Sequence, residues 1–350
     1  MNRSVAFTSP NTSEPVVVSD RLRRSLRDLR VSVIETCNYR CPYCMPADRT
    51  PEWTERDHAS SANRLDFAEI ETLVRCFARL GVSKVRLTGG EPLLRRGLPD
   101  LVARLAAIDG IDDLALTTNG SLLARQAKAL ADAGLHRLTV SLDTLDPERF
   151  SRLSGGRGKR DDVLAGIAAA EQAGFTAIKI NCVVQRGVND SDVLPLLAHF
   201  RGTSHVVRFI EYMDVGTCNR WQRTQVVPSA QLRDLIHARW PLRALEPNYR
   251  GEVASRYAYA DGAGELGFVS SVTAPFCGDC HRARLGADGQ LYTCLFAAGG
   301  TPLREFIAHG DAALTERIAA TWVGRVDRYS ELRGDVPGSE KRIEMFMVGG

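Results

Sequence analysis

Short β-branched or apolar segments alternate with amphipathic segments over the first two thirds of this chain, and this alternation restricts the possible folds most strongly. Six segments have the composition of buried strands: Arg30–Thr36, Lys84–Thr88, Leu114–Thr118, Arg137–Ser141, Ala177–Val184 and Val206–Glu211. Amphipathic helices are expected between them, at Asp66–Leu80, Gly97–Ile108, Leu122–Ala133, Asp161–Ala173 and Asp192–Phe200. Because parallel strands need crossover connections, the pattern predicts an α/β fold with a parallel sheet, either an incomplete barrel or a doubly wound sheet.

Six strand–helix units are fewer than the eight of a closed barrel, so we expect an open, incomplete (β/α)6 TIM-like barrel with ligands at the carboxyl ends of its strands. The alternation stops after Pro228, where a helix is expected at Ser229–Arg239 and a further helical segment at Leu303–Ala320. The predicted organisation is a flexible lead-in at 1–20, a partial barrel at 21–229 and a C-terminal extension at 230–350.

The charge and hydropathy of the chain exclude two classes of protein. Its 45 Lys and Arg against 42 Asp and Glu give a net charge of +3, too balanced for a protein that coats nucleic acid. No stretch approaches the roughly 18 to 20 apolar residues of a membrane-spanning helix, and residues 1–20 lack the layout of a signal peptide. We therefore expect a cytoplasmic protein that binds neither nucleic acid nor membranes.

Three of the nine cysteines follow the first predicted strand with the spacing C-x3-C-x2-C, as Cys37, Cys41 and Cys44. In a reducing compartment, such a group indicates metal or cluster ligands rather than disulfides. Three thiolates can hold three irons of a 4Fe-4S cluster and leave the fourth iron open to another ligand. A structural zinc loop is the alternative, although zinc usually takes four protein ligands.

A second group, Cys277, Cys280 and Cys294, has the spacing C-x2-C-x13-C. It again offers three thiolates, which favours a second 4Fe-4S cluster with an open iron. A zinc site completed by His281 is the alternative, but His281 follows Cys280 too closely to share one ion without strain.

Cationic residues stand in or beside several predicted strands. Arg282 and Arg284 alternate on a predicted hairpin that turns at Gly286–Gly289, so both guanidinium groups should lie on one face and form an anion clamp. Arg86, Lys179 and Arg208 lie within strands that could line the interior of a barrel. A buried unpaired cation is costly, so the group predicts an anionic ligand. Internal salt bridges are the alternative, with these carboxylates as partners: Glu35, Asp143 and Glu211.

Three further features stand at the ends of predicted strands. Thr88-Gly89-Gly90-Glu91-Pro92 ends the second strand, where paired glycines allow a close approach of the backbone and Glu91 can accept a hydrogen bond from an ammonium group. Taken alone, this motif is typical of a turn. Ser141 and Met213 end or follow the fourth and sixth strands, where a helix-capping serine and a packing methionine are the simpler interpretations.

The first cysteine group resembles the signature of the radical S-adenosylmethionine (SAM) superfamily. In that superfamily, the open iron chelates SAM, and an electron from the cluster cleaves SAM to a 5′-deoxyadenosyl radical. The Gly-Gly-Glu-Pro sequence resembles the superfamily motif that meets the SAM amino group, and Tyr43 matches the aromatic residue beside adenine. The resemblance assigns SAM contacts to these residues: Tyr43, Gly90, Glu91, Ser141 and Met213.

Both cysteine spacings, together with LTTNG, SLDTLD, RFIEYMDVG and HRARL, resemble the MoaA family, the GTP 3′,8-cyclases of molybdenum-cofactor biosynthesis, from about Asp20 to the last residue. These radical SAM cyclases convert GTP to (8S)-3′,8-cyclo-7,8-dihydroguanosine 5′-triphosphate: the adenosyl radical abstracts the ribose H3′, and C3′ then bonds to C8 of guanine. The resemblance assigns GTP contacts to these residues: Arg30, Arg86, Thr117, Lys179, Arg208, Arg282 and Arg284.

The same resemblance implies two 4Fe-4S clusters that face each other across one buried cavity, with guanine against the second. The family shares the double-glycine end, so Gly349 and Gly350 are expected to form a flexible catalytic finger that assists cyclisation; alone, such an end is typical of a frayed terminus. An unidentified electron donor and a downstream enzyme that forms cyclic pyranopterin are implied as partners, and a homodimer is compatible with the resemblance.

Two other functions stay open on these observations. One is a radical SAM enzyme that modifies peptides with an auxiliary cluster, although such enzymes usually carry more C-terminal cysteines. The other is a non-catalytic zinc or iron–sulfur module that binds a nucleotide or a protein. Cys76, Cys182 and Cys218 have no partner at ligand spacing and are interpreted as ordinary small residues, with Cys218 nearest to the predicted mouth of the barrel.

Overall fold

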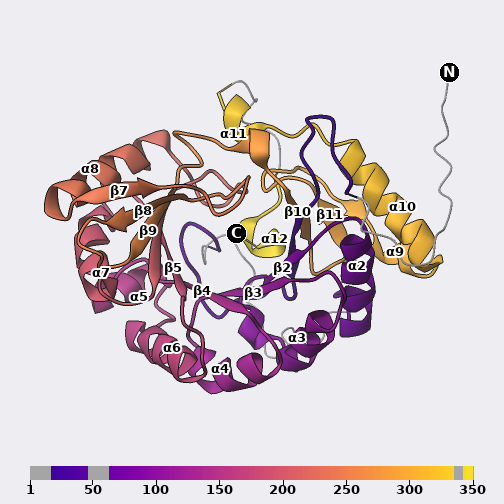
Figure 1. The fold of residues 1–350 in the computed structure, drawn as a ribbon, viewed down its shortest axis with the longest axis horizontal. Helices are drawn as coiled ribbons and strands as arrows, with labels where there is room; N and C mark the ends of the chain where they lie inside the picture. Colours follow the sequence, from indigo (N-terminus) through magenta and orange to yellow (C-terminus); the bar gives the residue numbers. More distant parts are fainter. Residues whose placement is uncertain (1–16, 46–62, 335–341, 350) are drawn as a thin grey trace.

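A computed structural model describes residues 17–45, 63–334 and 342–349 of the chain. Their strands form one curved sheet with helices around its outer face (Figure 1). Of the predicted lead-in, residues 1–16 lie outside the described residues. Asp20 is buried and pairs with Arg24 at 2.6 Å, so the folded part of the chain begins before residue 21.

The sheet has, within the described residues, the strand order β12-β11-β10-β1-β2-β3-β4-β5-β6-β9-β8-β7. Neighbours from β10 through β9 are parallel, whereas β11 and β12 at one end and β8 and β7 at the other are antiparallel. The central strands are β1 (Asp28–Ser32), β2 (Lys84–Thr88), β3 (Asp113–Thr118), β4 (Arg137–Ser141), β5 (Lys179–Val184) and β6 (Val206–Glu211). The C-terminal strands are β7 (Leu242–Leu245), β8 (Ser255–Tyr259), β9 (Glu265–Val269), β10 (Arg282–Leu285), β11 (Gln290–Tyr292) and β12 (Thr301–Pro302). The end strands β12 and β7 do not pair with each other, which confirms the predicted open, incomplete barrel.

The helices lie mainly outside the sheet, and α12 lies inside it (Figure 1). Those of the predicted barrel are α2 (Phe67–Arg79), α3 (Leu98–Ala106), α4 (Leu123–Asp132), α5 (Pro147–Leu153), α6 (Arg160–Gln172) and α7 (Val193–Phe200). Those that follow are α8 (Ser229–Arg239), α9 (Arg304–Ile307), α10 (Gly310–Val323), α11 (Tyr329–Leu332) and α12 (Met345–Val348). None of the helices in the described ranges is both long and apolar enough to cross a membrane.

Local sequence signals account for most of these boundaries. A capping box between Asp66 and Glu69 starts α2, and Gly81 after its end has φ +95°, a conformation that favours glycine. The predicted helix at Leu303–Ala320 is interrupted at Gly310, which has φ +87° and separates α9 from α10. The short helix α5 was not predicted, although Asp146 caps it and Pro147 stands at its first position.

The first strand ends at Ser32 rather than at the predicted Thr36 because the following residues leave the ladder. Gly90 and Glu91 donate backbone hydrogen bonds to the carbonyls of Ile34 and Thr36, both at 2.8 Å. The segment between β1 and the first cysteine group therefore packs on the Gly-Gly turn that follows β2.

The C-terminal extension contributes strands to both ends of the central sheet, and β10 pairs with β1 in parallel. The register places Arg284 opposite Arg30, and Arg30 opposite Arg86 on β2. Three guanidinium-bearing residues thus form a row across three adjacent strands. The division at residue 229 stays a prediction, since the extension and the barrel share one sheet.

Glu211, the last residue of β6, ties the barrel to the extension. Its carboxylate is 1% exposed and accepts hydrogen bonds from the backbone and hydroxyl of Ser229 at 2.8 and 3.0 Å. It also accepts from the backbone of Val272 and from the backbone and hydroxyl of Thr273. A single buried carboxylate therefore joins the ends of β6 and β9 to the start of α8.

Replacing Glu211 by Gln should lower the free energy of unfolding by about 2 to 4 kcal/mol, because the amide nitrogen would face donors that the carboxylate accepts. Thermal and denaturant unfolding of the purified protein measure this loss. Glu316→Gln, a change at an exposed position of α10, is the matched control. Equal stability of the two variants would contradict a structural role for Glu211.

Candidate functional site

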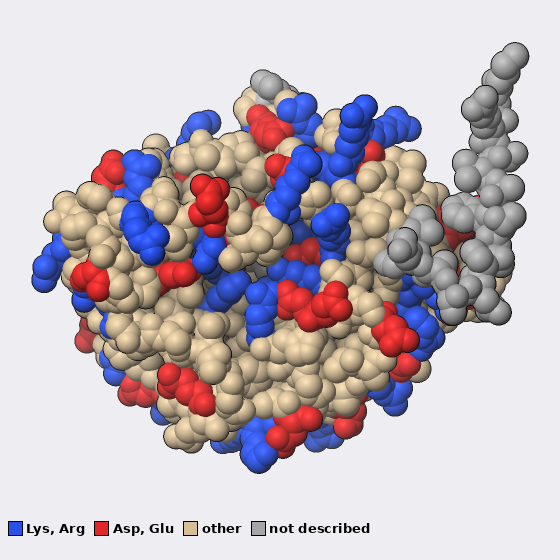
Figure 2. Space-filling view, viewed as in Figure 1, with Lys and Arg blue, Asp and Glu red and all other residues tan. Residues whose placement is uncertain are grey.

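A cavity of about 390 Å³ occupies the interior of the barrel. Basic side chains surround the central hollow in the space-filling view (Figure 2). Every residue to which the resemblance assigned a GTP contact lines this cavity: Arg30, Arg86, Thr117, Lys179, Arg208, Arg282 and Arg284. The second cysteine group and Met213 also line it. Residues from seven strands, β1, β2, β3, β5, β6, β9 and β10, therefore meet at one chamber.

The cavity cations are not neutralised by the carboxylates that offered the alternative explanation. Glu35 pairs with Arg64 at 2.7 Å, Asp143 accepts from the Tyr43 hydroxyl at 2.7 Å, and Glu211 is taken up by the hydrogen bonds described above. Within the described residues, no salt bridge involves any of the six predicted GTP-binding cations. The chamber thus holds an excess of positive charge that a polyanion would offset.

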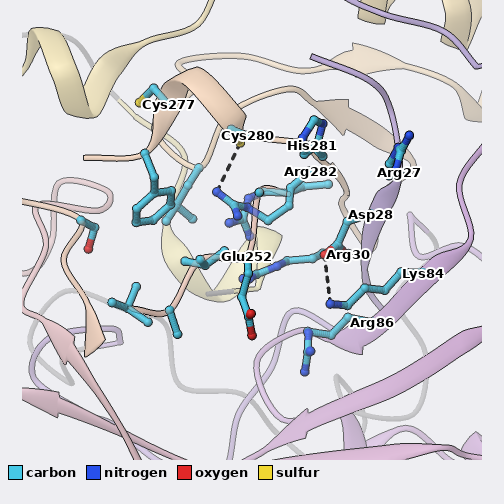
Figure 3. A pocket seen from close by; sticks show the side chains of 18 of the residues that line it. Arg27, Asp28, Arg30, Lys84, Arg86, Glu252, Cys277, Cys280, His281 and Arg282 are labelled. Carbon is cyan, nitrogen blue, oxygen red and sulfur yellow. Dashed lines mark hydrogen bonds and ion pairs between the residues drawn. The ribbon is translucent and has the colours of Figure 1, made fainter. Parts of the chain in front are cut away.

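Arg30 shows this excess most clearly. Its Nε is buried and has no hydrogen-bond partner among the described residues. Burial lowers the pKa of Arg30 well below its ordinary value, and the charges of Arg284 and Arg282 lower it further. Figure 3 shows Arg30 extending into the pocket between Arg282 and Arg86.

Hydroxyl and amide groups orient the other cations. Arg86 donates to the hydroxyls of Thr117 and Thr139 at 3.1 and 3.0 Å. Arg208 donates twice to the Asn181 amide oxygen, at 2.9 and 2.7 Å, and burial followed by the charge of Arg86 lowers its pKa to about 9. These neutral partners fix the side chains and leave their charges available to a ligand.

Lys179 is the lysine among these cavity cations, and its surroundings disfavour its charged form. Burial, followed by repulsion from Arg208, Arg137 and Arg86, lowers its pKa to about 7. A nearby anion would reverse this effect and return the lysine to its charged form.

The second cysteine group lies in a cationic environment. Arg325 donates to the Cys280 carbonyl at 2.7 Å and to its sulfur at 3.2 Å, and Arg282 reaches the same sulfur at 3.3 Å. Burial opposes the thiolate of Cys280, but Arg282 and Arg325 outweigh it and lower the pKa to about 6. By contrast, burial raises the pKa of Cys294 to about 11.

The first cysteine group lies on a compact loop with its own polar support. Arg40 donates to the carbonyls of Cys37 and Tyr39 at 2.8 and 2.9 Å. Burial and the nearby Glu91 raise the pKa of Cys37 to about 12. These buried thiols would ionise only against a strong local positive charge, such as that of iron.

A second, smaller cavity of about 40 Å³ adjoins this loop. It is lined by Cys41 together with two of the predicted SAM contacts, Tyr43 and Ser141. Asp143 lies in the same cavity, accepts the Tyr43 hydroxyl, and has its pKa raised to about 6 by burial. The two cysteine groups therefore line different cavities, and the predicted single shared cavity stays a prediction.

The Gly-Gly-Glu motif packs on the cysteine loop. A Cβ atom at Gly90 would overlap the Thr36 carbonyl, and Gly89, at φ +146°, would place one against the Ile34 carbonyl. The Glu91 carboxylate is fully buried and accepts from the Thr118 hydroxyl at 2.6 Å and the Asn119 backbone at 2.8 Å. Burial raises its pKa to about 7. Gly89 and Gly90 therefore allow the cysteine loop to pack closely on this turn. The predicted contact of Glu91 with SAM stays a prediction.

The C-terminal tail enters the same region. Gly349 accepts a hydrogen bond from Arg284 and lies against the Thr88 side chain, where a Cβ atom would overlap the threonine. Its φ of +67° also favours glycine. The predicted catalytic residue Gly350 lies outside the described residues.

Four residues that the sequence did not single out belong to this site. Lys84 lines the cavity at the start of β2 and contacts the Tyr249 hydroxyl at 3.1 Å. Asn181 accepts hydrogen bonds from Arg208, and Arg325 donates to the sulfur of Cys280. Lys84 could have been found, because it alternates with Arg86 on one strand face. Tyr249 and Arg325 carry no local signal.

Both cysteine groups fit iron–sulfur clusters by their donor chemistry. All six thiols are free, each group offers three of them on one short segment or hairpin, and each adjoins a cavity. In the described part of the chain, no group of His, Cys, Asp or Glu is placed to hold a single metal ion.

Replacing Gly90 by Ala should displace the first cysteine loop, because the new methyl group would overlap the Thr36 carbonyl. We expect a folded protein that retains about half as much iron after anaerobic reconstitution as the unmodified chain. Gly334→Ala is a control, since a Cβ there meets nothing within 4 Å and its backbone does not need the left-handed conformation. Undiminished iron in the Gly90 variant would contradict this account of the loop.

Two family models match the sequence in succession. The radical SAM superfamily model matches residues 31–200, and the model described as Molybdenum Cofactor Synthesis C matches residues 205–331. The first covers the last two residues of β1 and the elements from α2 to α7, and the second covers the elements from β6 to α10 and the first three residues of α11.

Curated relatives and a solved structure match the chain over most of its length. A GTP 3′,8-cyclase of Xanthomonas axonopodis pv. citri is 64% identical over 333 residues, covering 95% of this chain and 99% of that protein. A GTP 3′,8-cyclase of Acidothermus cellulolyticus is 52% identical over 361 residues, with 95% and 99% covered. The crystal structure of Streptococcus suis SuiB shares the fold, with a TM-score of 0.57 and 16% identity over 90% of this chain and 69% of that chain. The chain therefore belongs to the GTP 3′,8-cyclase (MoaA) family within the radical SAM superfamily.

Proposed function

We propose that this chain converts GTP to (8S)-3′,8-cyclo-7,8-dihydroguanosine 5′-triphosphate, the first step of molybdenum-cofactor biosynthesis. Membership in the family supports this activity, and one structural observation carries the assignment of its site. The six cavity cations have no salt bridge among the described residues and face one chamber that the second cysteine group also lines. A nucleoside triphosphate supplies the negative charge that this chamber lacks.

The residues of the cavity divide into two parts. In our proposal, the triphosphate and ribose are held by the cations of the N-terminal partial barrel, which are Arg30, Arg86, Lys179 and Arg208. The hydroxyl of Thr117 lies beside Arg86. Arg282 and Arg284 approach from β10 and complete the anion clamp. Fixing the nucleotide on several strands at once restricts its orientation, which a cyclisation between ribose and base requires.

Membership in the radical SAM superfamily implies a 4Fe-4S cluster and SAM. We propose that the ligands of this cluster are Cys37, Cys41 and Cys44. When bound, the cluster and SAM supply the radical that removes the ribose H3′. The SAM contacts proposed for this chain are Tyr43, Gly90, Glu91, Ser141 and Met213. We further propose that Cys277, Cys280 and Cys294 hold a second 4Fe-4S cluster, beside which the guanine would lie.

The remaining proposals concern partners, assembly and the C-terminal glycines. The activity requires an electron donor, whose identity the cavity does not indicate. Its product must pass to an enzyme that forms cyclic pyranopterin. A homodimer is compatible with the fold, and the end residues Gly349 and Gly350 are proposed to assist cyclisation.

The proposed function predicts different defects for the two cysteine groups. With the protein reconstituted under anaerobic conditions, Cys37→Ala should abolish formation of 5′-deoxyadenosine. Cys294→Ala should retain some formation of 5′-deoxyadenosine from SAM but produce no cyclised GTP. Chromatography of both products, with and without SAM, measures these outcomes, and Cys76→Ala on α2 is the control.

Two results would contradict the proposal. Formation of 5′-deoxyadenosine by the Cys37 variant would contradict the assignment of the first cysteine group as the ligands of the first cluster. The presence of zinc instead of about eight irons per reconstituted chain would contradict the proposal that this chain is a radical SAM enzyme.

The lowered pKa of Lys179 predicts that nucleotide binding takes up a proton. The pKa of Lys179 is about 7 in the protein without nucleotide, so its side chain is mostly neutral at pH 8. A bound triphosphate raises this pKa, and the side chain then takes up a proton. We expect an uptake of up to about one proton per GTP at pH 8 and almost none at pH 6. Calorimetry in buffers of different ionisation enthalpy measures the uptake, and Lys179→Met should eliminate it. An unchanged uptake in that variant would assign the proton to another group.

A further inference from the structure

The last described segment of the chain, Arg342–Gly349, is held by the loop that follows β6. Figure 1 shows α12 in the middle of the barrel, inside the ring of strands. The tail reaches Arg284 and Thr88 only through its final residues. The start of the tail is held by two other contacts: the Ile343 backbone donates to the Ala297 carbonyl at 2.9 Å, and a neighbouring side chain contacts the loop after β6.

Glu344 makes that contact. Its Oε1 accepts from the Thr217 backbone at 2.9 Å and from the Thr217 hydroxyl at 2.8 Å, and its Oε2 lies 2.9 Å from the Cys218 sulfur. Glu344 immediately precedes α12, at the position whose side chain can cap a helix. It makes no such cap, so its carboxylate is committed to the loop.

The loop is shaped to receive this carboxylate. Gly216 has φ +70°, which favours glycine, and a Cβ atom there would overlap the Glu344 carboxyl group. Gly216 therefore opens the space that Glu344 fills, while Thr217 and Cys218 supply the donors. A second contact precedes it: Arg342 donates to the carbonyl and carboxylate of Asp214 at 2.9 and 3.1 Å.

The same loop also touches the other components of the site. The Cys218 sulfur lies 3.6 Å from the Cys44 carbonyl on the first cysteine loop. Asn219 donates to the carbonyl of Met213 at 3.0 Å, and Met213 lines the main cavity. The segment from Met213 to Asn219 thus joins the first cysteine loop, the cavity wall and the tail.

We propose that Glu344 is a positioning residue that sets the depth of the tail and so places Gly349 beside Arg284 and Thr88. Helix α12 separates Glu344 from Gly349. It spans four residues, or about 6 Å at the rise of a helix, and acts as a short rigid spacer. The anchoring itself rests only on the contacts above, whereas its consequence for cyclisation rests on the proposed function.

The anchoring is tested by hydrogen exchange of the backbone amides of residues 345–349, followed by mass spectrometry of the full-length protein. Glu344→Ala removes the acceptor of three hydrogen bonds and should accelerate this exchange at least about ten-fold. Glu316→Ala, at an exposed position of α10, is the matched control and should leave the exchange unchanged. Equal exchange in the two variants would overturn the anchor.

Gly216→Ala tests the same contact from the other side, because its methyl group would displace the carboxylate without altering Glu344. It should accelerate exchange of the same amides. If Glu344→Ala or Gly216→Ala does not fold, as circular dichroism would show, Thr217→Val removes the hydroxyl donor but keeps the backbone donor. Thr217→Val should accelerate the exchange less than the other two variants. Exchange as slow as in the unmodified protein would also overturn the anchor.

The consequence for the reaction has a separate readout. In reconstituted Glu344→Ala, kcat for cyclised GTP should fall at least about ten-fold, and KM for GTP should change less than about three-fold, because the cavity cations stay in place. The ratio of 5′-deoxyadenosine to cyclised product should rise. Faster exchange with an unchanged product ratio would refute the positioning role. Absence of cyclised product from the unmodified chain would refute the proposed function, while the exchange experiment would still decide the anchor.

Discussion

The parallel pairing of β10 with β1 is the interaction on which the rest of the site depends. It joins residues that are about 250 positions apart and places Arg282 and Arg284 directly beside Asp28 and Arg30. Without it, the second cysteine group would have no place in the barrel interior, because the hairpin β10–β11 carries that group on its flanks. One strand pair thus converts an N-terminal partial barrel and a C-terminal segment into a single chamber.

This arrangement has an electrostatic cost. Arg30, Arg86 and Arg284 form a row across neighbouring strands, and burial lowers the pKa of each. Neutral partners such as Thr117, Thr139 and Asn181 orient the cations without removing their charge. A polyanion bound in the chamber would therefore offset an unfavourable concentration of positive charge, a pattern expected where function and stability compete. The surrounding apolar core and buried links such as Glu211 must compensate.

The loop after β6 shows how a structural segment acquires several roles. Met213 lines the cavity, Asp214 and Thr217 hold the tail, and Cys218 contacts both the tail and the first cysteine loop. The sequence interpretation of Cys218 as an ordinary small residue was incomplete. No ligand spacing marks it, since its partners are an oxygen of Cys44 and a carboxylate of Glu344, both distant along the chain.

Local patterns were sufficient for much of this protein. Three strands, Lys84–Thr88, Arg137–Ser141 and Val206–Glu211, have the bounds that their composition predicts, and the alternation of Arg282 and Arg284 places both at the cavity. These features depend on side-chain periodicity and on short cysteine spacings, which neighbouring residues encode. The partners of Glu91, the support of Cys280 by Arg325, the insertion of β10 beside β1 and the anchoring of the tail by Glu344 were not accessible in this way. They arise from packing between segments far apart in the chain, where no local periodicity specifies which surfaces meet.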